Sequence, residues 1–298
     1  KEGDYELPIE KECDTAIYVL SRISGEGSDR EAKRGDYLLS ETEIKDLRKL
    51  HERYDKLMLV LNTGGPVDLS EVDFVENILV LSQLGVQTGD VLADILLGKL
   101  YPSGKLATTW DKYENYCHEG DFGQINDTSY KEGIYVGYRY FQTAGAPVSY
   151  PFGYGKSYTT FEYSKPVVKA TADGFTATIT VKNTGSVAGK EAVQLYVAAP
   201  AGGLEKPAFE LKGFAKTKEL APGETQTLTI NVDKYTLASF NEATSAWETA
   251  AGTYKVMFGA NAADIRGTGE YRLKKAESWK TNNVLAPAAP INELSLQK

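Results

Sequence analysis

A single glutamate, Glu26, lies between two glycines in segment 24–30, which reads Ser-Gly-Glu-Gly-Ser-Asp-Arg. Gly25 and Gly27 open backbone conformations that other residues rarely adopt, and they keep the carboxyl clear of neighbouring side chains. A carboxyl presented in this way can act as a general acid and base. A polar surface loop with an incidental Glu explains the same spacing. The elements predicted on either side of the segment are needed to distinguish the two interpretations.

The elements around Glu26 favour a placed carboxyl. Residues 15–21 form a short apolar run that predicts a strand buried on both faces. Ser40 and Glu43 form a capping box that predicts a helix through about Tyr54. Further strands are predicted at 57–61 and 78–81, followed by a helix at 89–97. This alternation argues for a mostly parallel sheet, in which ligand-handling loops lie at the carboxyl ends of the strands, as Glu26 does after the first strand.

The second half of the chain has a different pattern, of short alternating strands separated by Gly, Pro and Asn turns. Such a pattern predicts an all-β sandwich. The predicted strands are 175–181, 192–197, 209–214, 225–232 and 254–258. We expect most of its large aromatic residues in the core, namely Tyr196, Phe214, Phe240, Trp247, Tyr254 and Phe258. The fold class is therefore α/β followed by all-β.

These patterns divide the chain into four parts. We assign residues 1–110 to the α/β domain and 164–275 to the β-sandwich. Residues 111–163 between them are rich in Tyr, and we expect this connector to pack on the domains because so many rings would not stay exposed. Residues 276–298 contain an Ala- and Pro-rich stretch and are predicted to be a linker or tail.

Composition excludes several classes of partner and cofactor. The net charge of −8 comes without a basic stripe, so we expect no nucleic-acid partner, and no apolar run is long enough for a membrane helix. Cys13, Cys117, His51 and His118 fit no familiar zinc spacing, so we expect no metal and no organic cofactor. The first residues lack the apolar core of a signal peptide, which favours a cytoplasmic over a secreted protein, but they also lack an initiator Met.

Five segments have distinctive sequences: 24–30, 35–40, 101–106 (Tyr-Pro-Ser-Gly-Lys-Leu), 132–140 and 150–161. Together they resemble glycoside hydrolase family 3, the β-glucosidase group. The first two resemble the second domain of that family, and residues 101–106 are similar to a later segment of the same domain. Segments 132–140 and 150–161 resemble the family's connector, with Lys156 where the family usually has Leu, and the sandwich resembles its fibronectin type III-like domain. The resemblance covers residues 14 to 273 approximately, with the motifs in the family's order.

The resemblance implies retaining hydrolysis of terminal β-D-glucosyl residues from oligosaccharides or glucosides. In that reaction one carboxylate attacks the anomeric carbon, and a second, about 5–5.5 Å away, protonates the leaving oxygen and later activates water. The resemblance implies that Glu26 is this acid/base, with a pKa raised by closure of the site. It also implies that Gly25, Gly27, Asp29 and Arg30 support the loop; a surface charge pair explains Asp29 and Arg30 equally well.

The chain departs from the family in lacking the nucleophile. The family's nucleophile is an Asp followed by Trp in a (β/α)8 barrel, whereas here Trp110 precedes Asp111 and no Asp-Trp pair occurs. A barrel of about 250 residues does not fit beside the predicted elements. Little sequence precedes the predicted strand at Thr15, so we expect residues 1–110 to be the later part of the family's α/β sandwich domain. We therefore expect a barrel partner in the same or another chain, an isolated chain without activity, and a possible oligomer.

Two other functions fit the same sequence. The missing barrel is compatible with a non-catalytic carbohydrate-binding or scaffold module. A β-xyloside or another β-glycoside is an alternative substrate, because the residues that select the sugar would lie mostly in the barrel.

Overall fold

The three apolar runs near the N-terminus pair as a parallel sheet in the computed structural model, which describes residues 6–9, 12–23, 30–118, 126 and 128–296. The strand order is β1 (Thr15–Ser21), β2 (Lys56–Asn62), β3 (Asn77–Val80), so β2 is central. The register pairs Ser21 with Asn62 and Leu61 with Val80, so the carboxyl ends of all three strands meet at one edge of the sheet.

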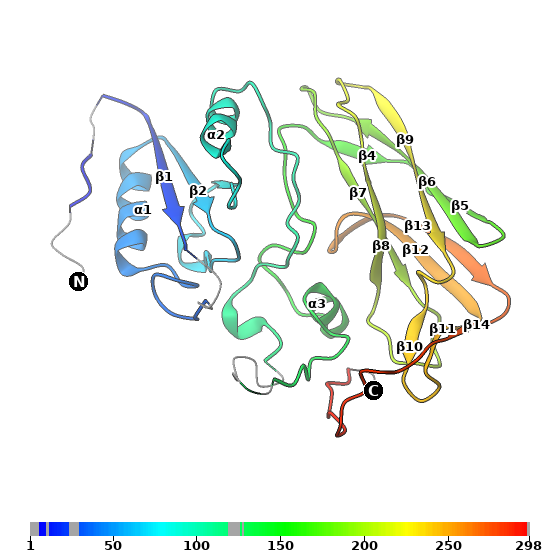
Figure 1. Cartoon of the computed structure of the whole chain (residues 1–298). Coiled ribbons are helices and arrows are strands. Elements are labelled where there is room, and N and C mark those ends of the chain that lie inside the picture. The colour runs from blue at the N-terminus through cyan, green and yellow to red at the C-terminus, as the bar shows by residue number, and fades with distance from the viewer. Residues whose placement is uncertain (1–5, 10–11, 24–29, 119–125, 127, 297–298) are drawn as a thin grey trace. The chain divides into compact units, whose positions relative to one another are not determined.

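Helix α1 (Glu41–Arg53) begins at the predicted capping box. The Ser40 hydroxyl accepts from the Glu43 amide at 3.2 Å, and the Ser40 amide donates to the Glu43 carboxylate at 2.8 Å. Leu47 and Leu50 of this helix are buried, and Figure 1 shows α1 lying beside β1 and β2. The remaining helical elements of this part are η1 (Ser70–Val72), α2 (Thr88–Leu96) and η2 (Tyr113–Asn115).

Strand β1 differs from its prediction, because only one of its faces is buried. Ala16 and Leu20 are buried, but Ile17 is 47% and Val19 53% exposed. β1 is an edge strand of the sheet, and the described residues around it cover only the face of Ala16 and Leu20. The expectation of a strand buried on both faces is therefore wrong for the described chain.

Contacts divide the chain into two units. The first contains residues 1–100 and 110–115, and the second contains residues 101–109 and 116–298. The first unit holds the parallel sheet with α1 and α2, and the second holds the antiparallel strands together with most of the Tyr-rich segment.

Two antiparallel sheets form the sandwich of the second unit. One has the order β13-β12-β7-β8; in the other, β6 pairs with β9 on one edge and with β4 and β5 on the opposite edge. The core between them includes Phe175, Ile179, Leu195 and Val256. The strands are β4 (Phe161–Tyr163), β5 (Val167–Ala170), β6 (Gly174–Asn183), β7 (Ala192–Ala198), β8 (Glu210–Lys216), β9 (Thr225–Asp233), β12 (Gly252–Asn261) and β13 (Asp264–Leu273). The predicted fold class, α/β followed by all-β, is confirmed.

The predicted aromatic core is correct in part. Tyr196, Tyr254 and Phe258 are each at most 1% exposed, whereas Phe214 is 71% exposed. Phe214 lies on β8, the edge strand of its sheet, and pairs with Gln194 of β7. An edge strand has fewer neighbours to cover a ring, so the expectation for Phe214 is wrong.

A small third sheet explains the position of Phe240 and Trp247, which are partly buried. It has the order β10 (Ser239–Asn241), β11 (Ala246–Thr249), β14 (Glu277–Lys280). Trp247 lies opposite Phe240 on one side and opposite Trp279 on the other, which places the three rings on one face. Strand β14 belongs to the segment predicted as a linker or tail. It pairs with β11, where Trp279 lies opposite Trp247.

The Tyr-rich segment packs on the sandwich within the second unit. It includes helix α3 (Tyr138–Ala144), whose Tyr138 stacks on Phe152 with ring centroids 4.7 Å apart and lies edge-on to Tyr196. The buried Tyr135 hydroxyl donates to Glu205 at 2.5 Å, and burial next to this carboxylate raises the pKa of Tyr135 to about 12. Across the described ranges, no helix is both long and apolar enough to span a membrane.

Candidate active site

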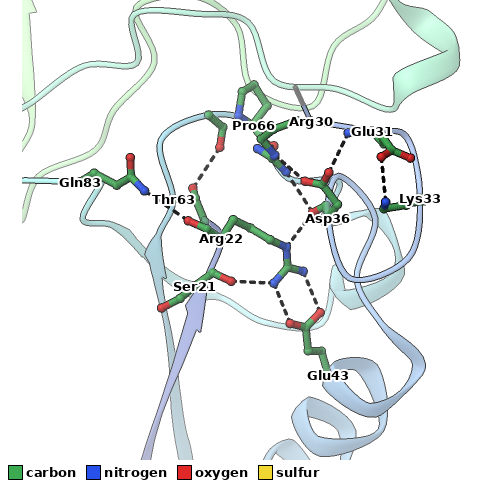
Figure 2. A network of polar contacts seen from close by, with 11 residues as sticks. Ser21, Arg22, Arg30, Glu31, Lys33, Asp36, Glu43, Thr63, Pro66 and Gln83 are labelled. Carbon is green, nitrogen blue, oxygen red and sulfur yellow. Dashed lines mark hydrogen bonds and ion pairs between the residues drawn. The ribbon is translucent and has the colours of Figure 1, made fainter. Parts of the chain in front are cut away.

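The predicted acid/base, Glu26, lies outside the described residues, as do Gly25, Gly27 and Asp29. Of the predicted site residues, the structure describes Arg30. The structure also describes the contacts of the residues that flank segment 24–29, namely Arg22 after β1 and Arg30 (Figure 2). We call Arg22, Arg30, Asp36 and Glu43 the anchor network.

Arg22 comes directly after β1 and is 7% exposed. Its two terminal nitrogens donate to the two carboxylate oxygens of Glu43, at 2.7 and 2.8 Å, in a bidentate ion pair. Its Nε donates to the backbone carbonyl of Asp36 at 2.6 Å. Such paired, charge-assisted bonds fix the orientation of a guanidinium plane. Arg22 therefore joins the end of β1 to the first turn of α1 and to the chain near residue 36.

Arg30 lies on the other side of segment 24–29 and reaches the same place. Its Nε donates to the Asp36 carboxylate at 2.6 Å, and its Nη2 donates to the Asp36 carbonyl at 2.9 Å. Its Nη1 donates to the Pro66 carbonyl at 2.7 Å, in the loop that follows β2. The Asp36 carbonyl therefore accepts from both Arg22 and Arg30, as Figure 2 shows.

The loops after β2 and β3 complete the surroundings of the anchor network. The buried Thr63 hydroxyl donates to the Gly65 carbonyl at 2.9 Å and so closes the turn before Pro66. Gln83, after β3, donates from its side chain to the Arg22 carbonyl at 3.2 Å. The carboxyl ends of the three strands are thus tied together through the two arginines.

The carboxylates of the anchor network are held in their charged form. Burial by itself would raise the pKa of Glu43, but the hydrogen bonds from Arg22 and from the Ser40 amide outweigh it and lower the pKa below its ordinary value. Burial also opposes the shift of Asp36, where hydrogen bonds from the Glu31 amide and from Arg30 lower the pKa. A general acid needs a raised pKa. Glu43 and Asp36 are therefore suited to supporting the site and unsuited to protonating a leaving group.

Loop support by Arg30 stays a prediction, and Arg22, Asp36 and Glu43 were not among the site residues predicted from the sequence. Each had a weak signal: an arginine directly after an apolar strand, an aspartate in segment 35–40, and the N3 glutamate of a capping box. None of these signals indicates that the three side chains meet. Within the described ranges, no group of three or more His, Cys, Asp or Glu side chains could hold a metal ion.

Comparison with protein families gives two matches along the chain. The glycosyl hydrolase family 3 C-terminal domain matches residues 5–158, and the fibronectin type III-like domain matches residues 191–262. The first match contains the anchor network and segment 24–29.

Individual relatives agree with the family matches. The chain is 39% identical over 295 residues to a β-glucosidase of Ruminococcus albus, an alignment that covers 94% of this chain and 31% of that protein. The structure of β-glucosidase 3B from Thermotoga neapolitana in complex with α-D-glucose is 40% identical, with a TM-score of 0.84 over 91% of this chain and 39% of that one. A β-glucosidase from Paenibacillus barengoltzii is 32% identical, with a TM-score of 0.87 over 96% of this chain and 34% of that one. The chain therefore spans about a third of the length of the relatives it matches.

Proposed function

Because the chain belongs to glycosyl hydrolase family 3, through that family's C-terminal domain and a fibronectin type III-like domain, we propose that it supplies the general acid/base, Glu26, to a retaining β-glucosidase. The observation that favours this most is where the described chain enters segment 24–29. It does so from the end of β1, at the edge where the carboxyl ends of three parallel strands meet, and ligand sites of open α/β sheets lie at that edge.

The proposed reaction has two steps. In the first, Glu26 gives its proton to the glycosidic oxygen while a nucleophilic carboxylate attacks the anomeric carbon, so that the leaving alcohol departs and a covalent glycosyl-enzyme forms. In the second, ionised Glu26 takes a proton from water, which attacks the anomeric carbon and releases the sugar with retained configuration. The first proton leaves with the alcohol, and the water that cleaves the glycosyl–carboxylate bond supplies the second, so that Glu26 ends the cycle protonated.

We propose that a (β/α)8 barrel domain, in the same or another chain, supplies the nucleophile and most contacts to the sugar. The support is that this chain spans about a third of the length of its relatives and has no Asp-Trp pair.

The proposed substrates are β-glucosides. All three of the relatives compared are named β-glucosidases, and the one from Thermotoga neapolitana is in complex with glucose. The names favour glucosides over xylosides. Assaying the barrel-containing enzyme on aryl glucoside and aryl xyloside side by side tests this part of the proposal.

The decisive experiment is Glu26→Ala in the enzyme that joins this chain to its barrel. Loss of general acid/base catalysis lowers turnover of alkyl glucosides by about 10²- to 10⁴-fold. Azide, which needs no base, should restore turnover of activated aryl glucosides and yield β-glucosyl azide, detectable by NMR. The matched control is Glu52→Ala, at an exposed position of α1. Near-normal turnover of alkyl glucosides by the Glu26 variant would rule out the assignment.

A further inference from the structure

The two arginines that flank segment 24–29 in the sequence share one acceptor. Arg22 is two residues before the segment and Arg30 is the residue after it, and both guanidinium groups donate to the Asp36 carbonyl, at 2.6 and 2.9 Å. The residues on either side of segment 24–29 are thus joined through the main chain at position 36.

Both arginines are themselves held by independent contacts. Glu43 fixes Arg22 through two hydrogen bonds, and the side chains of this pair are only 6% and 17% exposed. The Asp36 carboxylate and the Pro66 carbonyl fix Arg30. The Arg22 backbone is also tied on both sides, because its amide donates to the Asn62 carbonyl and its carbonyl accepts from Gln83. The end that comes from β1 is thus fixed in both its main chain and its side chain.

We propose that Arg22, oriented by Glu43, is a positioning residue for Glu26, acting with Arg30 through the Asp36 carbonyl. The inference rests on the proposed function, since it takes Glu26 as the acid/base. A general acid must come within about 2.6–3.2 Å of the atom that it protonates. A displacement of about 1 Å can cost on the order of 10²-fold in rate. The proposed role of the anchor network is to hold the residues that flank Glu26 in place.

A purely structural ion pair between β1 and α1 is the competing explanation, and leaving-group dependence separates the two. Release of 2,4-dinitrophenolate needs no proton, whereas release of an alcohol from an alkyl glucoside does. A displaced acid therefore lowers kcat/KM for the alkyl glucoside alone. Loss of folded enzyme lowers both kcat/KM values equally, so their ratio does not depend on the folded fraction.

The test is Arg22→Lys in the enzyme that contains the barrel, with kcat/KM measured on 2,4-dinitrophenyl β-glucoside and on an alkyl β-glucoside. Lysine keeps the charge but cannot donate to Glu43 and to Asp36 in the same geometry. We expect the alkyl glucoside value to fall on the order of 10- to 100-fold and the dinitrophenyl value to change less than about threefold. If Arg22→Lys yields no folded enzyme, Glu43→Gln makes the same test, because it leaves Arg22 without its ion-pair partner. Arg34→Lys is the matched control, since Arg34 pairs with Glu71 at an exposed position of the same unit.

Two outcomes overturn the proposal, and Glu26→Gln measured in parallel tells which part has failed. If Glu26→Gln shows the leaving-group effect while Arg22→Lys leaves the ratio of the two kcat/KM values unchanged, the positioning role is wrong and the acid/base assignment stands. If Glu26→Gln keeps both values, the proposed function is wrong and the positioning role falls with it. A selective loss in both variants, absent from the Arg34 control, supports the inference.

Discussion

The contact between Arg22 and Glu43 should be among the strongest polar contributions to the stability of the first unit. Glu43→Gln preserves the size of the side chain and an oxygen that can accept from the Ser40 amide. It removes the charge and one of the two acceptors that Arg22 uses. The Arg22 guanidinium would then stay nearly buried without a carboxylate.

The structure bounds the size of this effect. Removing one partner of a buried ion pair costs about 3–5 kcal/mol, and an exposed pair contributes about 0–1 kcal/mol. The Arg22 side chain is 6% exposed and that of Glu43 17% exposed, so the pair is closer to the buried case. We expect Glu43→Gln to cost about 2–4 kcal/mol, between these two limits. Ser40→Ala, which removes only the cap, should cost about 1 kcal/mol.

Amide hydrogen exchange of α1, followed by mass spectrometry of peptides that cover residues 41–53, measures this effect without interference from the second unit. The expected loss of about 2–4 kcal/mol corresponds to roughly 30- to 1000-fold faster exchange, because 1.4 kcal/mol is a factor of ten. The Glu43 pKa is lowered in the folded chain, so its contribution is complete above its ordinary value of 4.5 and is lost as the pH falls through the folded value. The difference between the wild type and the variant should therefore shrink below about pH 4.5.

The matched control is Glu71→Gln, which breaks the exposed pair with Arg34. It should change α1 exchange less than about threefold. Exchange of α1 in the Glu43 variant that stays within threefold of the wild type at pH 7, or that equals the Glu71 variant, would refute the reasoning.

Four further outcomes are expected. Burial raises the pKa of Asp46 above its ordinary value of 3.8 and outweighs the opposing effects of Lys49, Lys45 and Tyr18, so the charge of Asp46 lowers stability at neutral pH. Asp46→Asn should therefore slow amide exchange of α1 at pH 7, and the difference from the wild type should disappear near pH 4. Faster exchange of the variant at pH 7 would contradict this prediction. The buried Asn183 side chain makes four hydrogen bonds, so Asn183→Ala should destabilise the sandwich by about 3 kcal/mol or more in urea unfolding. Phe214→Thr on the exposed edge should change unfolding by less than about 0.5 kcal/mol, while Phe258→Ala in the core should cost about 3–5 kcal/mol, and similar costs for the two would invalidate the burial argument. The chain by itself should not hydrolyse aryl β-glucosides, and adding the barrel domain should restore hydrolysis; measurable turnover by the chain alone would contradict the proposed division of the site.

The local patterns of the sequence were enough to predict most elements. The capping box at Ser40 predicts the start of α1, and the apolar runs predict the three parallel strands, because each signal lies within a few residues. The order of the sheets and the exposure of a given face depend on neighbours far along the chain. For this reason the exposed sides of β1 and β8 could not be predicted from Val19 or Phe214 themselves.

The anchor network could not be predicted for the same physical reason. Arg22 and Glu43 are 21 residues apart, and Arg30 meets Pro66 across 36 residues. No periodicity or spacing rule connects such pairs, since they meet only when β1, α1 and the loop after β2 are folded. The acid/base prediction itself rests on the resemblance, and it stays a prediction because Glu26 lies outside the described residues.

The acceptor that Arg22 and Arg30 share belongs to the main chain, and this has a consequence for engineering the chain. A substitution at position 36 can remove the carboxylate that Arg30 uses, but every residue at that position keeps the carbonyl. Libraries that vary residue 36 would therefore remove one contact of Arg30 and leave the bond from Arg22 to the main chain in place. The two arginines can thus be adjusted separately, with position 36 acting on Arg30 and position 43 on Arg22.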